Sequence, residues 1–151
     1  MKILIKGGRV VDPKNDFDKV ADVLVDNGVI SEIGENINAD GDVTVIDAEG
    51  KIVSRGLVDM HSHLRDPGQE YKEDIESGTR SAAMGGITSI ACMPNTKPVT
   101  DSEPIVTYIK TKAKEVGHVN VYPIGSISKG LEGKELAEIG ELKNAGAVAI
   151  S

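Results

Sequence analysis

Two histidines separated by one residue, His61 and His63, are the side chains of this sequence with the clearest potential for chemistry. They lie in the stretch GLVDMHSHLRDPG, at the end of an apolar run. On an extended chain such side chains leave the same face roughly 6.5 to 7 Å apart. Two imidazoles at that spacing can bind one zinc ion with Zn–N distances of about 2.0 to 2.1 Å. The alternative is a hydrogen-bonded histidine pair at a strand end, but nearby Asp59, which can support a ligand from behind, favours the metal.

Two further side chains near the histidines can bind a substrate. Arg65 presents a fixed fork of donors that fits a carboxylate or a phosphate, and its alternative role is a salt bridge to Asp66 or Glu70. Asn95 stands in ACMPNTKPVTD, just after an expected strand, where its amide can donate to a substrate oxygen. Its alternative role is an Asx-turn, which is common for asparagine beside proline.

The chain has only one other histidine, His118. It follows a glycine that is expected to end a helix, and there we expect a solvated imidazole that interacts with the helix dipole rather than a metal ligand. A catalytic zinc site usually has at least three protein ligands and a water molecule. Any further ligand within this chain would therefore be Asp, Glu or Lys.

The composition is that of an acidic globular protein. The 151 residues are 39% hydrophobic, carry a net charge of −7 and include no Trp and 3% aromatic residues. This allows one ordinary domain with a packed core and argues against nucleic acid and anionic membranes as partners. The chain has no apolar run of about 18 residues and no signal-peptide pattern, so we expect a cytoplasmic protein. The single cysteine, Cys92, is expected to be a small buried hydrophobic residue.

Residues 1–53 are predicted to form a small antiparallel β module. KILIKGGRVVD alternates apolar residues around a Gly-Gly pair, and ADVLVDNGVISEIG reads as two strands joined by Asn27-Gly28, a strong hairpin signal. DVTVIDAEGKIVSRG supplies another pair of strands. None of these residues has an evident chemical role.

Residues 54–151 are predicted to alternate strands and helices. The expected strands are Leu57 to Met60, ITSIACM, VNVYPIGSI and AVAIS, and the expected helices are Glu70 to Met84, Ser102 to Val116 and Lys134 to Asn144, with Leu136, Ile139 and Leu142 facing inward. This order predicts an α/β fold with a parallel sheet, either doubly wound or a barrel. In both folds the working residues lie at the carboxyl ends of the strands, where HSHLR, MPNT and GSIS occur.

The stretch from Gly56 to Asp101 resembles the amidohydrolase superfamily and, within it, the dihydroorotases of the longer bacterial type. The combination of DMHSHLRDPG with MPNT carries the resemblance, which continues more weakly from KGGRVVDP to AGAVAIS. Related hydantoinases and allantoinases share the histidine pair but usually lack this arginine context. Arg65 and Asn95 therefore discriminate between these relatives.

The resemblance implies a two-zinc hydrolase on a (β/α)8 TIM-type barrel, beside a small β domain built from both chain ends. Such enzymes reversibly cyclise N-carbamoyl-L-aspartate to L-dihydroorotate in pyrimidine biosynthesis. By analogy, His61 and His63 bind the more buried zinc, while Arg65 and Asn95 hold the substrate carboxylate in a pocket that His63 also lines. The metals make a hydroxide available near neutral pH. The resemblance also implies a homo-oligomer and a possible association with aspartate carbamoyltransferase.

The length departs from this family pattern. A complete barrel needs about 250 residues, and residues 54–151 have room for its first four strands and three helices. The remaining ligands and the aspartate general base are expected beyond Ser151. We therefore expect an N-terminal fragment that is inactive alone, with open edges at the first and fourth barrel strands, near Leu57 and Val148.

Two alternative functions stay open at this point. One is another cyclic amidase, of the hydantoinase or allantoinase type. The other is a metal-free assembly partner resembling the inactive dihydroorotase-like subunits that occur with aspartate carbamoyltransferase. The presence of both histidines, Arg65 and Asn95 argues against the second alternative, because a non-catalytic partner has no chemical need for them.

Overall fold

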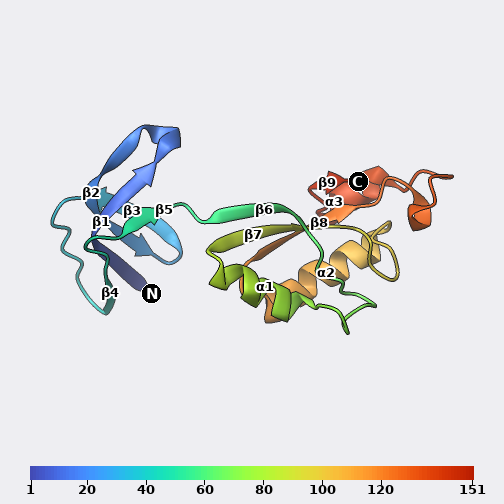
Figure 1. Cartoon of the computed structure of the whole chain (residues 1–151), viewed down its shortest axis with the longest axis horizontal. Coiled ribbons are helices and arrows are strands. Elements are labelled where there is room, and N and C mark those ends of the chain that lie inside the picture. Colours follow the sequence, from blue (N-terminus) through green and yellow to red (C-terminus); the bar gives the residue numbers. More distant parts are fainter. The chain divides into compact units, whose positions relative to one another are not determined.

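The computed structural model describes all residues from Met1 to Ser151. The chain forms two compact units, Met1–Arg55 and Gly56–Ser151 (Figure 1). The first unit ends just after the expected boundary at residue 53, because strand β5 (Ile52–Ser54) still pairs with the first strand of the chain through Ser54. Each unit has its own hydrophobic core.

The first unit is a five-stranded sheet. Besides β5 it contains β1 (Lys2–Asp12), β2 (Phe17–Asp26), β3 (Val29–Gly34) and β4 (Val43–Asp47), with a short 3-10 helix η1 (Pro13–Asn15) between β1 and β2. The hairpin predicted at Asn27-Gly28 is confirmed, because β2 and β3 pair antiparallel across it. Both turn residues have positive φ, 49° and 80°, as this type of tight turn requires.

The prediction of an entirely antiparallel module is wrong for its last two strands. Both β4 and β5 pair with β1 in the parallel direction, in succession along its length. A two-residue turn forces neighbouring strands to run antiparallel, whereas the longer connection from residue 35 to 42 carries the chain to the other edge of β1. The sheet is therefore mixed, in the order β3-β2-β1-β4 with β5 also on β1.

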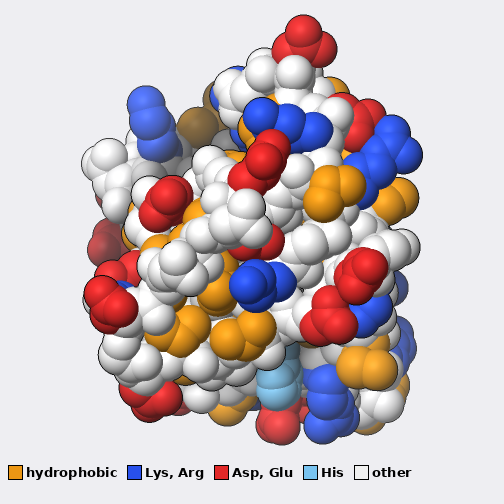
Figure 2. All heavy atoms as spheres, turned by 90° about the vertical axis from the view of Figure 1, so that its left-hand side faces the viewer, with side chains coloured by type: hydrophobic (Ala, Val, Ile, Leu, Met, Phe, Trp, Pro, Cys, Tyr) orange, Lys and Arg blue, Asp and Glu red, His pale blue; other side chains and the backbone are white.

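This unit combines a small core with many exposed apolar side chains. Its core is a small cluster around Val10, Ala21 and Val23. Figure 2, which views the left-hand side of Figure 1, shows hydrophobic side chains exposed among charged ones. The large aliphatic residues exposed on this unit are Val20, Val29, Ile30, Ile33, Val45, Ile46 and Ile52. The unit contains none of the predicted site residues.

The second unit alternates strands and helices as predicted. Its elements are β6 (Leu57–Ser62), α1 (Ile75–Met84), β7 (Ile87–Cys92), α2 (Glu103–Val116), β8 (Asn120–Gly125), the 3-10 helix η2 (Lys129–Leu131), α3 (Ile139–Ala145) and β9 (Ala149–Ile150). All strand pairs are parallel, in the order β6-β7-β8-β9. In Figure 1, α1 and α2 lie side by side on one face of the sheet. A doubly wound sheet instead reverses its strand order and carries helices on both faces.

The predicted start of the first helix, at Glu70, is wrong by about one turn. Asp74 has extended backbone angles and accepts a hydrogen bond from the Ser77 amide at 2.7 Å, which makes it the N-cap of α1. Glu70 is engaged earlier, because its carboxylate accepts from the Gly68 amide at 2.7 Å. The polar residues before Asp74 therefore belong to the loop that follows β6.

The predicted start of the third helix, at Lys134, is also wrong. The Ala137 amide donates to Ile127 at 2.9 Å and the Lys129 amide donates to Glu135 at 2.9 Å, so this segment is extended and pairs with the preceding loop. Leu136, predicted to face inward, is 66% exposed for this reason. Ile139, at the start of α3, is half-exposed, and only Leu142 of the predicted inward residues is fully buried.

The main core of the second unit lies between α1, α2 and the sheet. Its buried members are Leu64, Ile75, Ala82, Ile90, Cys92 and Ile109. Cys92 is buried as predicted. As expected, β6 and β9 form the two edges of the sheet, and Leu57 and Val148 are 61% and 56% exposed. No helix in this structure has the length and apolar character needed to cross a membrane.

Candidate active site at the carboxyl ends of β6 and β7

The predicted site residues come from the ends of two neighbouring parallel strands. His61 lies within β6, His63 and Arg65 follow it directly, and Asn95 lies in the loop after β7. The pairing of the two strands extends to their ends, where the Met93 amide donates to Ser62 at 2.8 Å. Because parallel strands end at the same edge of a sheet, four residues that are up to 34 positions apart share one region.

The two histidine rings lie close together on an exposed surface. Their centroids are 5.3 Å apart and the rings are inclined at 67°. The register between β6 and β7 shifts between Asp59 and Ser62, so the strand is irregular where it carries His61. Such irregularities redirect side chains near functional sites. The expectation that Asp59 supports an imidazole differs from its observed contact, in which its carboxylate accepts from the backbone amide of His61 at 3.0 Å.

Asn95 contacts one of these histidines directly. The His63 Nδ1 and Asn95 Oδ1 atoms are 2.8 Å apart. Since an amide oxygen only accepts, Nδ1 is the donor in this contact, and in the neutral imidazole the lone pair then lies on Nε2. Histidines that bind metals almost always donate their other ring N–H in this way. The alternative Asx-turn is not the observed role, because the Asn95 side chain bonds to His63.

Arg65 is held in an uncommon backbone conformation, with a φ of +63°. Its carbonyl accepts from the Gln69 amide at 3.0 Å. The alternative role as a partner of Asp66 or Glu70 is not observed. Asp66 is bonded to groups of α1 and α2, and Glu70 is bonded to Gly68. The guanidinium is therefore not neutralised by either neighbouring carboxylate.

The two loops that carry these residues are fitted closely against each other. The Lys97 amide donates to Pro67 at 2.9 Å, and Gln69 Nε2 donates to the Asn95 carbonyl at 3.3 Å. Gly68 has a φ of +90°, and a Cβ atom at this position would lie 1.8 Å from the Lys97 carbonyl oxygen. A side chain at position 68 would therefore push the two loops apart.

This contact makes a prediction about stability. Gly68→Ala is expected to lower the free energy of unfolding of the protein by about 3 kcal/mol, because backbone strain and a clash with backbone add together. Gly86→Ala is the matched control: its φ is +78°, but a Cβ atom there would have no other atom within 4 Å. It is expected to cost about 1 kcal/mol. Urea unfolding measures both, and equal losses for the two variants would contradict the proposed loop contact.

The other candidate ligands lie elsewhere or are unsuited to a metal. Nowhere in the chain do three or more His, Cys, Asp or Glu side chains gather in a way that could hold a metal ion. Burial raises the pKa of the Cys92 thiol to about 11, which disfavours the thiolate that binds metals. Two neutral imidazoles fit zinc as part of a donor set, because at least three protein ligands are usual.

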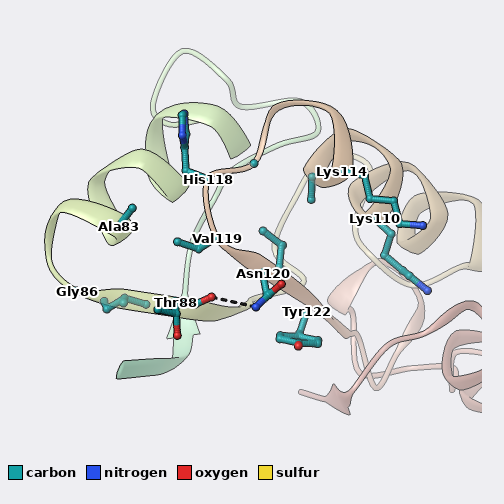
Figure 3. Close-up of a pocket in the computed structure, with 13 residues that line it drawn as sticks. Ala83, Gly86, Thr88, Lys110, Lys114, His118, Val119, Asn120 and Tyr122 are labelled. Carbon is teal, nitrogen blue, oxygen red and sulfur yellow. Dashed lines mark hydrogen bonds between the residues drawn. The ribbon is translucent and has the colours of Figure 1, made fainter. Parts of the chain in front are cut away.

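His118 lies away from this site. It precedes β8, at the amino ends of the strands, and lines a cleft of about 580 Å³ with residues of α1, α2, β7 and β8 (Figure 3). In the same view Lys110 and Lys114 extend away from His118. Lys110 Nζ donates to the Ala145 carbonyl at 2.7 Å, at the C-terminus of α3. The structure therefore does not bring His118 together with His61 and His63.

A group of residues beside the site was not found by sequence reasoning. Asp66 is buried and bonded to Tyr108 and Lys112 of α2. Tyr108 lies within the helix that was expected from Ser102 to Val116, but nothing in the sequence linked it to the loop after β6. The spacing of Tyr108 and Lys112, four residues apart on one helix face, was the only available signal.

Comparisons with known proteins agree on one family. The sequence profile of the family described as dihydro-orotase-like matches residues 50–151. The chain is 66% identical over 150 residues to a dihydroorotase of Acetivibrio thermocellus, covering 99% of this chain and 35% of that protein. It is 59% identical over 151 residues to a dihydroorotase of Geobacter sulfurreducens, covering all of this chain and 36% of that protein. The chain thus spans about a third of the length of these relatives.

Solved structures with a similar fold include cyclic amide hydrolases that are described as hydantoinases instead of dihydroorotases. An L-hydantoinase (dihydropyrimidinase) from Arthrobacter aurescens matches 98% of this chain and 32% of its own, with a TM-score of 0.84 and 31% identity. A D-hydantoinase (dihydropyrimidinase) from Thermus sp. matches 94% of this chain and 30% of its own, with a TM-score of 0.72 and 30% identity.

Proposed function

This chain belongs to the dihydro-orotase-like family, and from that membership we propose that it serves the reversible, zinc-dependent cyclisation of N-carbamoyl-L-aspartate to L-dihydroorotate in pyrimidine biosynthesis. The observation that carries this proposal is that His61, His63, Arg65 and Asn95 all lie at or just after the carboxyl ends of β6 and β7, where His63 contacts both His61 and Asn95. A histidine pair suited to a metal there adjoins groups suited to a carboxylate.

We propose that the second unit is the first half of a (β/α)8 barrel. The sequential parallel order β6-β7-β8-β9, with α1 and α2 on one face, supports this. In a barrel the working residues lie at the carboxyl ends of the strands. His61, His63 and Asn95 lie at such ends.

In the proposed site, His61 and His63 would hold zinc. The metal, when bound, supplies Lewis acidity and a hydroxide near neutral pH. The protein's own contribution at this point is the orientation of His63. Asn95 Oδ1 accepts from its Nδ1, which fixes the ring and leaves Nε2 as the nitrogen that would bind the metal.

Arg65 and Asn95 would bind the substrate carboxylate. The guanidinium fork of Arg65 matches two carboxylate oxygens, and it is not neutralised by Asp66 or Glu70. The Asn95 oxygen already accepts from His63, so its NH2 group remains as a donor to the substrate. Asn95 would therefore link the metal ligand to the carboxylate, which explains why an amide suits this position better than an acid.

Asn95→Asp separates these two roles. In the full product of the gene that encodes this chain (the complete gene product), the new carboxylate can still accept from His63, so zinc content is expected to stay unchanged. Its negative charge repels the substrate carboxylate, so KM for L-dihydroorotate is expected to rise about 10- to 100-fold. Steady-state kinetics and metal analysis measure the two effects. Loss of zinc with an unchanged KM would contradict this assignment of Asn95.

The proposed reaction is tested on the complete gene product with L-dihydroorotate, hydantoin, 5,6-dihydrouracil and allantoin. Hydrolysis of L-dihydroorotate with kcat/KM well above the others is expected, because only this substrate offers a carboxylate to Arg65. The fold similarity to hydantoinases favours a second candidate, a cyclic amidase for neutral rings. Faster hydrolysis of hydantoin or dihydrouracil would establish it instead. Absence of both zinc and hydrolysis would favour a non-catalytic assembly partner.

A polypeptide limited to residues 1–151 is expected to hydrolyse L-dihydroorotate negligibly, even with added zinc. The physical reason is its donor set: His61 and His63 are two ligands, and no third group gathers with them. Kinetic assays on a species whose mass is verified as 15.9 kDa measure this. Robust turnover by that species would overturn the proposal that the site needs further groups from the rest of the complete gene product.

The remaining proposals concern the cell. The lone, buried Cys92 is compatible with a reducing compartment, and we propose a cytoplasmic location. Small molecules are the proposed substrates. A homo-oligomer and an association with aspartate carbamoyltransferase follow from the family resemblance alone, and size-exclusion chromatography of the complete gene product, with and without that enzyme, measures both.

A further inference from the structure

The carboxylate of Asp66 is fully buried beside the proposed site and is held by groups from two helices. Its Oδ1 accepts from the Tyr108 hydroxyl at 2.9 Å, and its Oδ2 is 2.7 Å from Lys112 Nζ. Oδ2 also accepts a longer bond, of 3.4 Å, from the Ile75 amide at the start of α1. The loop after β6 is thus attached to α2 through one side chain.

Asp66, Tyr108 and Lys112 satisfy one another's polar groups. A buried carboxylate is costly unless it is paired and hydrogen-bonded, and here the side chain of Asp66 is 0% exposed. Lys112 Nζ also lies 3.3 Å from the Tyr108 hydroxyl, one helical turn away. The hydrogen bond with Asp66 raises the pKa of Lys112, so its charge is retained near neutral pH.

The contacts of Asp66 with Tyr108 and Lys112 affect Arg65, because Arg65 and Asp66 are adjacent in the chain. A left-handed backbone is unfavourable for a residue with a side chain, and it persists where the surroundings hold it. Arg65 has such a backbone, with the anchored Asp66 on one side and the Gln69 amide on its carbonyl. The backbone conformation of Arg65 sets the direction in which its guanidinium leaves the loop.

We propose that Tyr108 and Lys112 are positioning residues that act through Asp66 to hold Arg65 in place for the substrate carboxylate. Helix α2 thereby contributes to substrate affinity without touching the substrate. This inference rests on the proposed function, in which Arg65 binds the carboxylate of L-dihydroorotate.

Tyr108→Phe in the complete gene product tests this inference. It removes one hydrogen bond to Asp66 and keeps the aromatic ring. KM for L-dihydroorotate is expected to rise about three- to tenfold, with kcat within about twofold and zinc content unchanged. The matched control is Tyr122→Phe, which alters a tyrosine of similar exposure, 43% against 39%, whose hydroxyl makes no hydrogen bond in the structure. Its KM is expected to stay unchanged.

The double variant Tyr108→Phe with Arg65→Met shows whether the rise in KM caused by Tyr108→Phe depends on Arg65. Once Arg65 is absent, Tyr108→Phe is expected to raise KM no further. Effects that multiply, or an unchanged KM for Tyr108→Phe alone, would overturn the inference while leaving the role of Arg65 intact. An unchanged KM for Arg65→Met alone would overturn the carboxylate assignment, and this inference with it.

A second variant covers the case in which Tyr108→Phe does not fold. Asp66→Asn removes the buried charge itself, so no unpaired anion remains in the interior. It weakens the attachment to Lys112 and is expected to raise KM for L-dihydroorotate about three- to tenfold, again with little change in kcat. Wild-type KM in a folded Asp66→Asn variant would overturn the inference.

Discussion

Replacement of His61 by alanine in the complete gene product is expected to lower kcat/KM for L-dihydroorotate about a thousandfold and to remove bound zinc. His61 and His63 are the only imidazoles at this end of the sheet, and their rings are 5.3 Å apart. The loss of one ligand from a small donor set weakens the binding of the metal. The Lewis acidity that the metal would supply is lost with it. Steady-state kinetics and metal analysis of the same preparation measure the two losses together.

His118→Ala is the matched control for this experiment. It makes the same chemical change at the third histidine of the chain, which lies at the opposite ends of the strands and lines a separate cleft (Figure 3). Zinc content and kcat/KM are expected to match those of the wild type. Equal zinc and equal activity in His61→Ala and the wild type would exclude His61 as a ligand.

Arg65→Met is expected to lower kcat/KM for L-dihydroorotate about 100- to 1000-fold, mainly through KM. The change removes a charge-assisted, two-pronged contact and leaves the substrate carboxylate without its partner. The kcat/KM of Arg65→Lys is expected to lie between those of Arg65→Met and the wild type, because the charge remains but the planar fork is lost. KM and kcat for the three proteins give this comparison directly.

Arg80→Met serves as the control for the loss of an arginine. Arg80 is exposed on α1 and forms no ion pair in the structure. Its replacement is expected to leave KM and kcat unchanged.

Hydantoin or 5,6-dihydrouracil offers a second check on Arg65, because neither ring has a carboxylate. A loss of activity toward these rings equal to that toward L-dihydroorotate would contradict a carboxylate role for Arg65.

The order of elements in the second unit could be predicted because it depends on local patterns. Apolar periodicity and the glycines at helix ends locate β6, β7, β8 and β9 with three helices between them. The helix starts could not be predicted as well, because they depend on contacts outside the helix. Asp74 caps α1 in place of the expected start at Glu70, and the segment before α3 pairs with the loop at Ile127 instead of continuing the helix.

The direction of β4 and β5 in the first unit could not be predicted from local patterns for a similar reason. The sequence DVTVIDAEGKIVSRG predicts two strands, and two strands form. Whether such strands run parallel or antiparallel to β1 depends on how the connection from residue 35 to 42 crosses the sheet. A short hairpin such as Asn27-Gly28 leaves no such freedom, and there the prediction is confirmed.

For the proposed site, residue spacing and element order were enough to predict which residues lie together at the strand ends. The spacing of His61 and His63 places them on one face, and parallel order brings Asn95 to the same edge. Their hydrogen-bond partners depend on the folded chain: Asn95 bonds to His63, 32 positions away, and Asp66 pairs with Lys112 instead of the adjacent Arg65. The reason is that a buried polar group must find its partner wherever packing places one, and sequence proximity does not decide which group that is.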